Sequence, residues 1–364
     1  MAIVFNPSKG FTLGVELEMQ LIDPVTFKLV NSSGKILEAT AKDPLVAGSV
    51  KHELMESNLE VITGICKTTT EVKAELSSKL KRVIEIAGEN NILISGGGTH
   101  PFSLASDQRI TDDVRYARLK NLLQLVARNF SIFGMHVHVG VDGAEKSIYV
   151  LNRMIYYLPY ILALSANSPF WEGENSGLRS YRTKIFETLP IAGLPFYFKG
   201  WDDYTTLAED FIATGTIESI RELWWDVRPH PDFGTIEVRI CDTPSTLKDV
   251  LAITAFIQAL VKRFSDDFDA GVEYKRPHSW VIRENKWRAC RFGLDGEFIA
   301  EDGTATVKTR DLLRDIVGGF KREADELGSA EDMQGVFDII DNGTGAIRQL
   351  KSWKEDGDMK RVVS

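Results

Sequence analysis

Cysteine is scarce in this chain of 364 residues. The three cysteines, Cys66, Cys241 and Cys290, lie far apart, and no two of them have the Cys-x-x-Cys spacing. Their odd number and wide separation argue against a disulfide framework and are typical of a protein in a reducing compartment. We therefore predict a cytoplasmic location.

An excess of basic residues is also missing. The chain has 43 Lys and Arg against 52 Asp and Glu, which gives a net charge of −9. Nucleic acids and anionic membranes attract surfaces with a net positive charge. The charge balance argues against binding to either through overall charge, so we predict no nucleic-acid partner. A local cationic pocket is still compatible with this net negative charge.

Neither a signal peptide nor a membrane span is evident. The first ten residues have no basic region followed by a sustained apolar stretch. Residues 148–166 are apolar enough to test as a span, but they contain Arg153 and Pro159. A charge in the middle of a membrane costs about 2.5–3.5 kcal/mol on insertion scales. We predict no membrane partner and a helix buried in a soluble core.

Internal repeats, low-complexity segments and a clear interdomain linker are absent too. The 43% hydrophobic and 26% charged residues are ordinary for a globular protein. The length is sufficient to bury a large core. We predict a single domain over residues 1–364, in which residues 278–364 form a helical C-terminal extension.

Two periodicities predict the secondary structure. Extended, partly alternating or short apolar segments predict strands at residues 14–23, 52–65, 92–95, 132–142 and 233–242. Helical spacing predicts helices at residues 68–90, 112–130, 148–166 and 246–264. Residues 167–198, rich in Gly, Pro and aromatics, lack a clear period and are typical of an ordered functional loop. We predict an α+β fold, with a mostly antiparallel sheet covered by helices on one face and open on the other.

The first of these strands, "GVELEMQLID", places carboxylates at every second position. Side chains alternate between the two faces of a strand, so Glu16, Glu18 and Gln20 share one face. Two carboxylates two residues apart lie about 6–7 Å from each other. For one isolated strand a solvated polar face is the ordinary explanation.

The same pattern recurs in three more predicted strands. Each has aliphatic residues on one face and polar residues on the other. The polar positions are Glu56, Asn58 and Glu60; His136, His138 and Gly140; and Thr235, Glu237, Arg239 and Cys241.

If these strands form one sheet, its polar face collects several carboxylates and one or two imidazoles. Unpaired buried charges cost several kcal/mol each, so such a cluster requires cations. Oxygen ligands with an occasional imidazole suit Mg²⁺ or Mn²⁺. Carboxylates that hold divalent ions are typical of phosphoryl-transfer sites, where Arg239 could contact the transferred phosphate.

The sequence resembles the bacterial carboxylate–amine ligases of the glutamate–cysteine ligase type 2 group, distant relatives of glutamine synthetase. The resemblance covers about residues 11–265. It rests on six segments in this order: "GVELEMQLID", "ELMESNLEVITG", "GGGTHPF", "GMHVHVGV", "SANSPFWEGENSGLRSYR" and "TIEVRICD".

This resemblance implies a glutamine synthetase-like catalytic fold, in which the antiparallel sheet curves into a funnel that holds ATP and Mg²⁺. Arg239 matches the arginine beside the γ-phosphate, and Arg239 and Glu237 are the catalytic candidates. The residues that match the family's metal ligands are Glu16, Glu18, Glu53, Glu60, His136 and Glu237.

Further candidates lie outside these matches. For contacts to ATP phosphates or to a substrate carboxylate they are Arg179, Arg182 and Lys184. For the acid-substrate pocket they are Trp225, Arg228, His230 and His100.

The implied activity is ATP-dependent amide formation through an acyl phosphate, with γ-glutamylcysteine as a candidate product. The implied substrates are a small acid and an amine, most simply amino acids, and the implied assembly is a homodimer. Two alternatives stay open on the same carboxylates: a Mg²⁺-dependent phosphate or amide hydrolase, and a catalytically silent protein that binds Mg·ATP.

Overall fold

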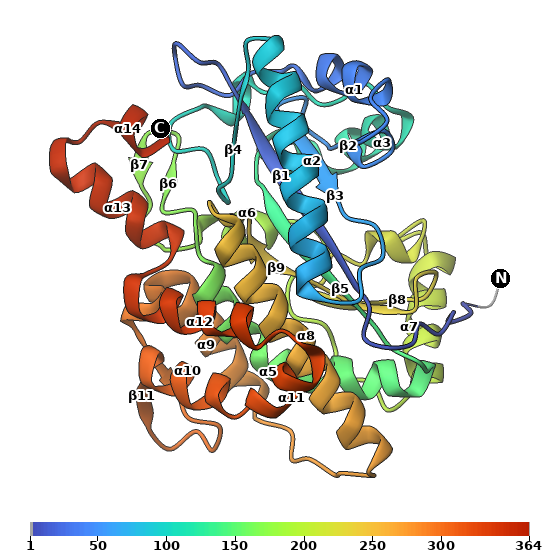
Figure 1. The fold of residues 1–364 in the computed structure, drawn as a ribbon. Helices are drawn as coiled ribbons and strands as arrows, with labels where there is room; N and C mark the ends of the chain where they lie inside the picture. The colour runs from blue at the N-terminus through green and yellow to red at the C-terminus, as the bar shows by residue number, and fades with distance from the viewer. Residues whose placement is uncertain (1–2, 364) are drawn as a thin grey trace.

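The computed structural model describes residues 3–363, and an antiparallel sheet of seven strands lies at its centre (Figure 1). The strand order is β2–β3–β1–β5–β9–β8, and β4 pairs with the C-terminal end of β1. The strands are β1 (Leu13–Ile22), β2 (Val50–His52), β3 (Asn58–Ile62), β4 (Leu93–Ser95), β5 (Gly134–Gly140), β8 (Val227–His230) and β9 (Thr235–Asp242).

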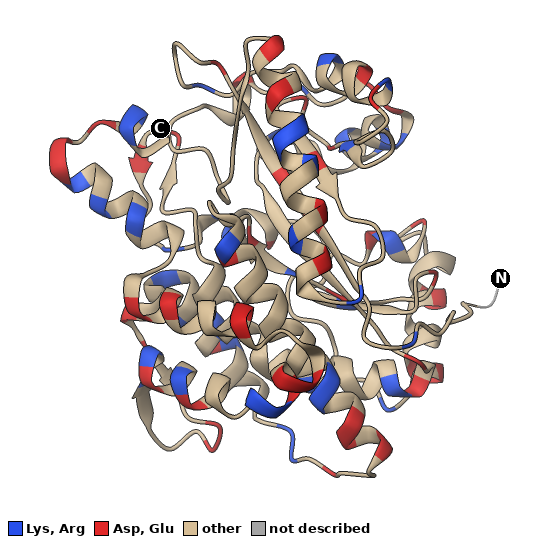
Figure 2. Ribbon diagram, viewed as in Figure 1, with Lys and Arg blue, Asp and Glu red and all other residues tan. Residues whose placement is uncertain are grey.

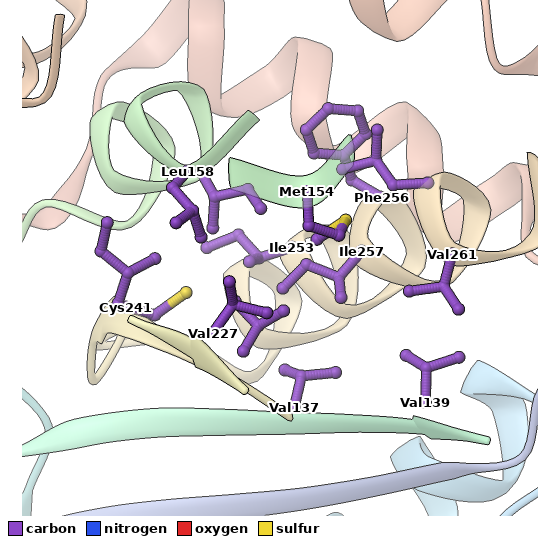
Figure 3. Close-up of a cluster of buried hydrophobic side chains, with 14 of the residues drawn as sticks. Val137, Val139, Met154, Leu158, Val227, Cys241, Ile253, Phe256, Ile257 and Val261 are labelled. Carbon is purple, nitrogen blue, oxygen red and sulfur yellow. The ribbon is translucent and has the colours of Figure 1, made fainter. Parts of the chain in front are cut away.

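Three long helices cover one face of this sheet: α2 (Thr69–Glu89), α5 (Ala144–Ser165) and α8 (Leu247–Asp269). Figure 3 shows Val137 and Val139 of β5 pointing toward the side chains of α5 and α8. Full burial of such a side chain contributes about 1.5–3 kcal/mol. A shift of the strand register by one residue would move these aliphatic side chains from the core to the open face. Their burial therefore fixes which residues lie on the open face of the sheet.

The apolar segment predicted at residues 148–166 is helical up to Ser165, as part of α5, which begins earlier, at Ala144. Arg153 lies over the ring of Phe264 at 4.5 Å and pairs with Asp267 at 3.3 Å, both on α8. Within residues 3–363, no helix has an apolar stretch long enough to cross a membrane.

Two predicted elements are each divided in two. Residues 52–65 do not form one extended strand, because a turn separates β2 from β3. The predicted helix at 112–130 consists of α3 (Val114–Leu123) and α4 (Leu125–Arg128). Gln124 separates them with a φ of 52°, which interrupts the helical hydrogen bonds.

The pairing of β5 with β9 contains an irregularity between Met135 and Val137, where β9 has one extra residue. Strict alternation predicts Cys241 on the face of Glu237 and Arg239. That prediction is wrong, because the extra residue reverses the alternation. Cys241 pairs with Met135 and faces the core (Figure 3).

The glycines of "GGGTHPF" lie where the chain passes close to the end of β9. A Cβ at Gly98 would lie 2.5 Å from Cγ of Asp242, and one at Gly96 would lie 2.5 Å from the carbonyl oxygen of Pro244. Asp242 is fully buried and accepts hydrogen bonds from the hydroxyls of Ser168 and Ser180. The glycine run is therefore a close-packing feature of the fold.

The C-terminal helices pack against the long helices of the core, where α9 lies along α5 and α12 along α8 (Figure 1). One hydrophobic core contains side chains from before and after residue 278. The elements of this part are α9 (Ser279–Phe292), β10 (Glu297–Ile299), β11 (Thr306–Lys308), α10 (Thr309–Gly318), α11 (Lys321–Leu327), α12 (Ala330–Asn342), α13 (Gly345–Asp356) and α14 (Met359–Val363).

Short elements complete the fold. They are α1 (Ser33–Ala41), β6 (Phe170–Trp171), β7 (Glu174–Asn175), α6 (Tyr181–Phe186), α7 (Trp201–Ala213) and the 3₁₀ helices η1 (Ala105–Asp107), η2 (Ile220–Glu222) and η3 (Gly293–Asp295).

The outer helices carry both signs of charge (Figure 2). Along α2, Lys79 pairs with Glu75 at 2.6 Å and Arg82 with Glu85 at 3.0 Å. Pairs of this kind contribute little to stability, and they form a solvated surface.

Candidate active site

The open face of the sheet is the floor of a cavity of about 530 Å³. The register of the strands brings the predicted polar residues together on this floor. Glu16 pairs with His136, and Glu18 pairs with Glu60. On the other side of β5, His138 pairs with Glu237. The alternation seen in the sequence is thus a single surface in the structure.

Glu53 reaches the same cavity from the turn after β2. Burial, with the charge of Glu18, raises its pKa to about 8. Burial, with Glu53 and Glu16 close by, also raises the pKa of Glu60 well above its usual value. Within residues 3–363 neither carboxylate forms an ion pair. These two acids therefore face the cavity without a cation.

Glu56, which alternation placed beside Glu60, does not line the cavity. It lies in the turn before β3 and pairs with Arg109 at 2.8 Å. The turn replaces the predicted extended segment, and it directs Glu53 inward and Glu56 outward. The family match to Glu53 thus agrees with the structure better than the alternation does.

Two histidines hold Glu16 in place. His136 Nδ1 lies 3.0 Å from one oxygen of Glu16, and His138 Nε2 lies 3.3 Å from the other. Burial opposes the charge of Glu16, but the two imidazoles outweigh it and lower the pKa. Burial, together with the charge of Arg239, lowers the pKa of His136. A neutral imidazole is the form that binds a metal ion.

Glu237 is held by two arginines. Its carboxylate accepts hydrogen bonds from Nε of Arg228 at 2.7 Å and from Nη1 of Arg239. Burial alone would raise the pKa of Glu237, but these guanidinium groups outweigh it and hold the pKa far below its usual value. One ligand atom each from Glu16, His136 and Glu237 lie within 4.8 Å of one another.

Two arginines, Arg239 and Arg182, line the cavity. Within residues 3–363 the Nε of neither has a hydrogen-bond partner, and both Nε atoms are buried. Arg182 otherwise donates to the carbonyl oxygens of Arg239 and Ile240, each at 3.3 Å. It crosses the start of β5 where a Cβ at Gly134 would lie 2.2 Å from Nη2, so only glycine fits there. Buried unpartnered donors of this kind suit an anionic ligand.

The predicted site residues divide into two groups. The structure brings ten of them to the cavity: Glu16, Glu18, Glu53, Glu60, His136, Arg182, Arg228, His230, Glu237 and Arg239. It places the other four outside the lining: His100, Arg179, Lys184 and Trp225.

These four side chains have other partners, which correct the predicted placement. Arg179 faces Asp295 at 3.5 Å, and Lys184 pairs with Glu187 at 2.5 Å. Trp225 is buried in the core beside aromatic rings of the 196–204 segment.

His100 stabilises a turn, and it lies outside the cavity. Its Nε2 lies 2.9 Å from the carbonyl oxygen of Phe27, and its Nδ1 accepts the N–H of Ser103 at 2.9 Å. Burial lowers its pKa to about 4. Both ring nitrogens are used within the loop, which leaves none for a substrate.

Sequence reasoning missed the residues that form the walls. Arg115 and Tyr116 of α3, and Arg221 and Trp224 at η2, line the cavity above the floor. None lies on a strand, so alternation gives no signal for them. The sequence predicts Trp225 as a pocket residue, but its neighbour Trp224 is the residue that lines the cavity.

The residues present fit a divalent cation and a polyphosphate. Hard carboxylate oxygens with one neutral imidazole form a donor set for Mg²⁺ or Mn²⁺. The two arginines with unpartnered Nε groups supply the complement for phosphate oxygens. The floor thus separates into an acidic part that needs cations and a basic part that needs anions.

Comparisons with known proteins show the family of the chain. The sequence model of "Glutamate-cysteine ligase family 2" matches residues 12–364. A relative from Gloeobacter violaceus, named "Putative glutamate--cysteine ligase 2", is 43% identical over 364 residues, which are 100% of this chain and 98% of the relative. A relative from Frankia alni, "Putative glutamate--cysteine ligase 2-1", is 42% identical over 100% of this chain and 96% of its own length.

Solved structures share the fold at low sequence identity. Glutamate–cysteine ligase from Francisella tularensis in complex with AMP has a TM-score of 0.73 at 14% identity, covering 99% of this chain and 88% of that one. A bifunctional glutathione synthetase from Pasteurella multocida has a TM-score of 0.67 at 14% identity, covering 97% and 51%. The predicted α+β fold with an antiparallel sheet is confirmed.

Proposed function

Because the chain belongs to glutamate–cysteine ligase family 2, we propose that it is an ATP-dependent carboxylate–amine ligase that joins glutamate to the amino group of cysteine. One observation carries the proposal. Two carboxylates without ion-pair partners among residues 3–363, Glu53 and Glu60, and two arginines, Arg182 and Arg239, line the same cavity. This combination suits a metal-bound nucleotide at the place where a phosphoryl group is transferred.

In the proposed reaction a carboxylate oxygen of the acid attacks the γ-phosphorus of ATP. The bond to the bridging oxygen breaks, ADP leaves, and an acyl phosphate forms. The nitrogen of the amine then attacks the acyl carbon, and phosphate leaves as the nitrogen loses a proton. Atoms and charges balance without an enzyme nucleophile, so the protein acts by positioning and electrostatics.

The arginines have the electrostatic role. Glu237 binds Arg239 through Nη1 and thereby orients the guanidinium, whose charge would stabilise a phosphate in the cavity that Arg239 lines. Arg182 would bind the same phosphate from the side of α6. Removing one such preorganised donor typically costs about 10²–10³ in turnover.

The carboxylates would hold Mg²⁺. Glu16, Glu18, Glu53, Glu60, His136 and Glu237 are the proposed ligands. A bound Mg²⁺ neutralises phosphate charge and orients the nucleotide. His138 helps to orient Glu16. The His138 ring is itself held in place, because its Nδ1 forms a hydrogen bond with the hydroxyl of Thr235 at 2.9 Å.

An ADP-release screen tests the proposal. Purified protein is incubated with Mg·ATP and pairs of amino acids, and ADP is measured with the acid alone, the amine alone and both together. The ligase forms ADP at its full rate only with both. Phosphate release that needs no amine would indicate the hydrolase instead, and Mg·ATP binding without any turnover would indicate the silent protein.

Two further expectations accompany the proposal. A cytoplasmic location and a homodimer stay predictions from the sequence and its resemblance. Light scattering at micromolar concentration measures the second directly, and the mass of a single chain would refute it.

A further inference from the structure

An ion pair joins two of the elements that form the walls of the cavity. Arg118 of α3 donates to the carboxylate of Glu222 in η2, and its Nε lies 3.0 Å from an oxygen of Glu218. Neither Arg118 nor Glu222 lines the cavity, but their neighbours Leu119 and Arg221 do. The pair therefore lies on the outer side of the two walls. Glu222 has a side chain only 5% exposed, so this is no ordinary surface pair.

The elements that the ion pair joins, α3 and η2, are attached to opposite edges of the sheet. The segment that leads into α3 is held at the β2 end, where Thr111 donates its backbone N–H to Leu54, and the ring of Tyr116 packs on His52. The η2 element is held at the β8 end through Arg228. Since β2 and β8 are the two ends of the strand order, the contact between α3 and η2 bridges the floor between them.

The η2 end of this bridge connects directly to a proposed metal ligand. Nη1 of Arg228 donates to the carbonyl oxygens of Ile220 at 3.2 Å, Arg221 at 2.8 Å and Leu223 at 3.2 Å. The same guanidinium holds Glu237 through Nε at 2.7 Å. The position of η2 therefore affects how Arg228, one of the two arginines bound to Glu237, holds this carboxylate.

The α3 end is packed on its inner side only. Tyr116 and Leu119 are buried, whereas Val114 is 89% exposed and Leu122 is 58% exposed. Gln124, a non-glycine residue with a φ of 52°, ends α3 and separates it from α4. A helix that packs on one side and ends at a break in the backbone can move without unfolding the elements around it.

From these contacts we propose that Arg118 and Glu222 are positioning residues that form a strap across the cavity. The strap parts to admit the nucleotide and closes over it, and in the closed state it holds η2 where Arg228 orients Glu237. Closing a site over its substrate excludes water and completes the constellation of polar groups. This role rests on the proposed function, since the nucleotide is the ligand over which the strap closes.

A cross-linking experiment with a fixed order of addition tests the strap. Cysteines replace both partners (Arg118→Cys with Glu222→Cys), and a bismaleimide that spans the pair joins them. The native cysteines, Cys66, Cys241 and Cys290, are all buried. A matched control joins Lys248 and Asp338 after the same replacement. They form a surface pair at 2.7 Å between α8 and α12, away from the cavity.

The readout is binding and release of radiolabelled Mg·ATP. Cross-linking before the nucleotide should slow its association at least tenfold, and cross-linking after it should slow its release at least tenfold. The control cross-link and the uncross-linked double variant should show neither effect. Equal rates with and without the cross-link, with binding intact, would overturn the strap alone. Failure of the wild-type protein to bind Mg·ATP would overturn the proposed function and the strap with it.

Discussion

Glu18 and Glu60 lie directly opposite each other on β1 and β3, with both side chains on the open face of the sheet. Like charges in this position destabilise a sheet. Burial and the nearby carboxylates of Glu53, Glu16 and Glu18 raise the pKa of Glu60. The protonated form is favoured because it avoids the same repulsion. The fold therefore carries an unfavourable charge cluster that a bound cation would relieve.

Glu60→Gln should stabilise the metal-free protein and weaken its binding of Mg²⁺. The amide keeps the shape but removes one of the repelling charges and one hard ligand. We expect a higher Tm in chelator, and a Tm that rises less on addition of Mg²⁺ than in the wild type. Thermal unfolding monitored by calorimetry at several Mg²⁺ concentrations measures both.

Glu56→Gln is the matched control for that variant. Glu56 lies four residues earlier and pairs with Arg109 outside the cavity. Its change should leave the Mg²⁺ dependence of Tm as in the wild type. If both variants respond to Mg²⁺ like the wild type, Glu60 is no ligand.

The contribution of Glu53 to the stability of the metal-free protein should fall as the pH rises from about 5 to about 8. Burial raises the pKa of Glu53 to about 8, so the folded protein still holds a proton that the unfolded chain has lost above about 4.5. Each increase in pH through this window then favours the unfolded state. Tm in chelator should decline more steeply for the wild type than for Glu53→Gln, and saturating Mg²⁺ should reduce the decline. Equal slopes for the two proteins in chelator would contradict this.

Much of the floor could be predicted because a strand has a period of two. Alternation alone placed Glu16, Glu18, His136 and Glu237 on one face, since the buried aliphatic residues opposite them leave no other register. It could not place Glu53, which reaches the cavity from a turn. The match between whole segments does not depend on strand geometry, so it included Glu53.

Local pattern also failed where the backbone departs from regularity. The extra residue in β9 turned Cys241 toward the core, and the break at Gln124 divided a helix with continuous apolar spacing. The walls of the cavity come from such segments. Which of Trp224 and Trp225 faces inward depends on tertiary contacts that no local sequence signal specifies.

Arg239→Met should lower turnover by about 10²–10⁴-fold without raising the Mg²⁺ requirement. The methionine keeps much of the length but removes the guanidinium that we propose contacts the transferred phosphate. Taking a cation from an acidic floor does not weaken its affinity for Mg²⁺. Steady-state kinetics at varied Mg²⁺ separate the two effects.

Arg179→Met provides the comparison, because Arg179 faces Asp295 outside the cavity. We expect its turnover within a few-fold of the wild type. A loss as large as that of Arg239→Met would restore the sequence prediction that Arg179 contacts ATP and would contradict the placement.

Gly98→Ala should destabilise the protein, whereas Gly88→Ala should not. A Cβ at Gly98 would lie 2.5 Å from Cγ of Asp242, and overpacking of this kind costs about 1–3 kcal/mol. A Cβ at Gly88, within α2, meets nothing within 4 Å, and alanine there gains about 1 kcal/mol of helix propensity. Urea unfolding measures the midpoints of the two variants. Equal midpoints would show that the loop around Gly98 accommodates the added Cβ without loss of stability.

The most direct test of the central claim follows oxygen from the acid to phosphate. Protein, Mg·ATP, cysteine and glutamate labelled with ¹⁸O in its side-chain carboxylate are incubated, and the phosphate released is analysed by mass spectrometry. If an acyl phosphate forms and the amine displaces it, each phosphate carries one ¹⁸O atom and one amide forms with it. Unlabelled phosphate, or labelled phosphate formed without amide, would contradict the account.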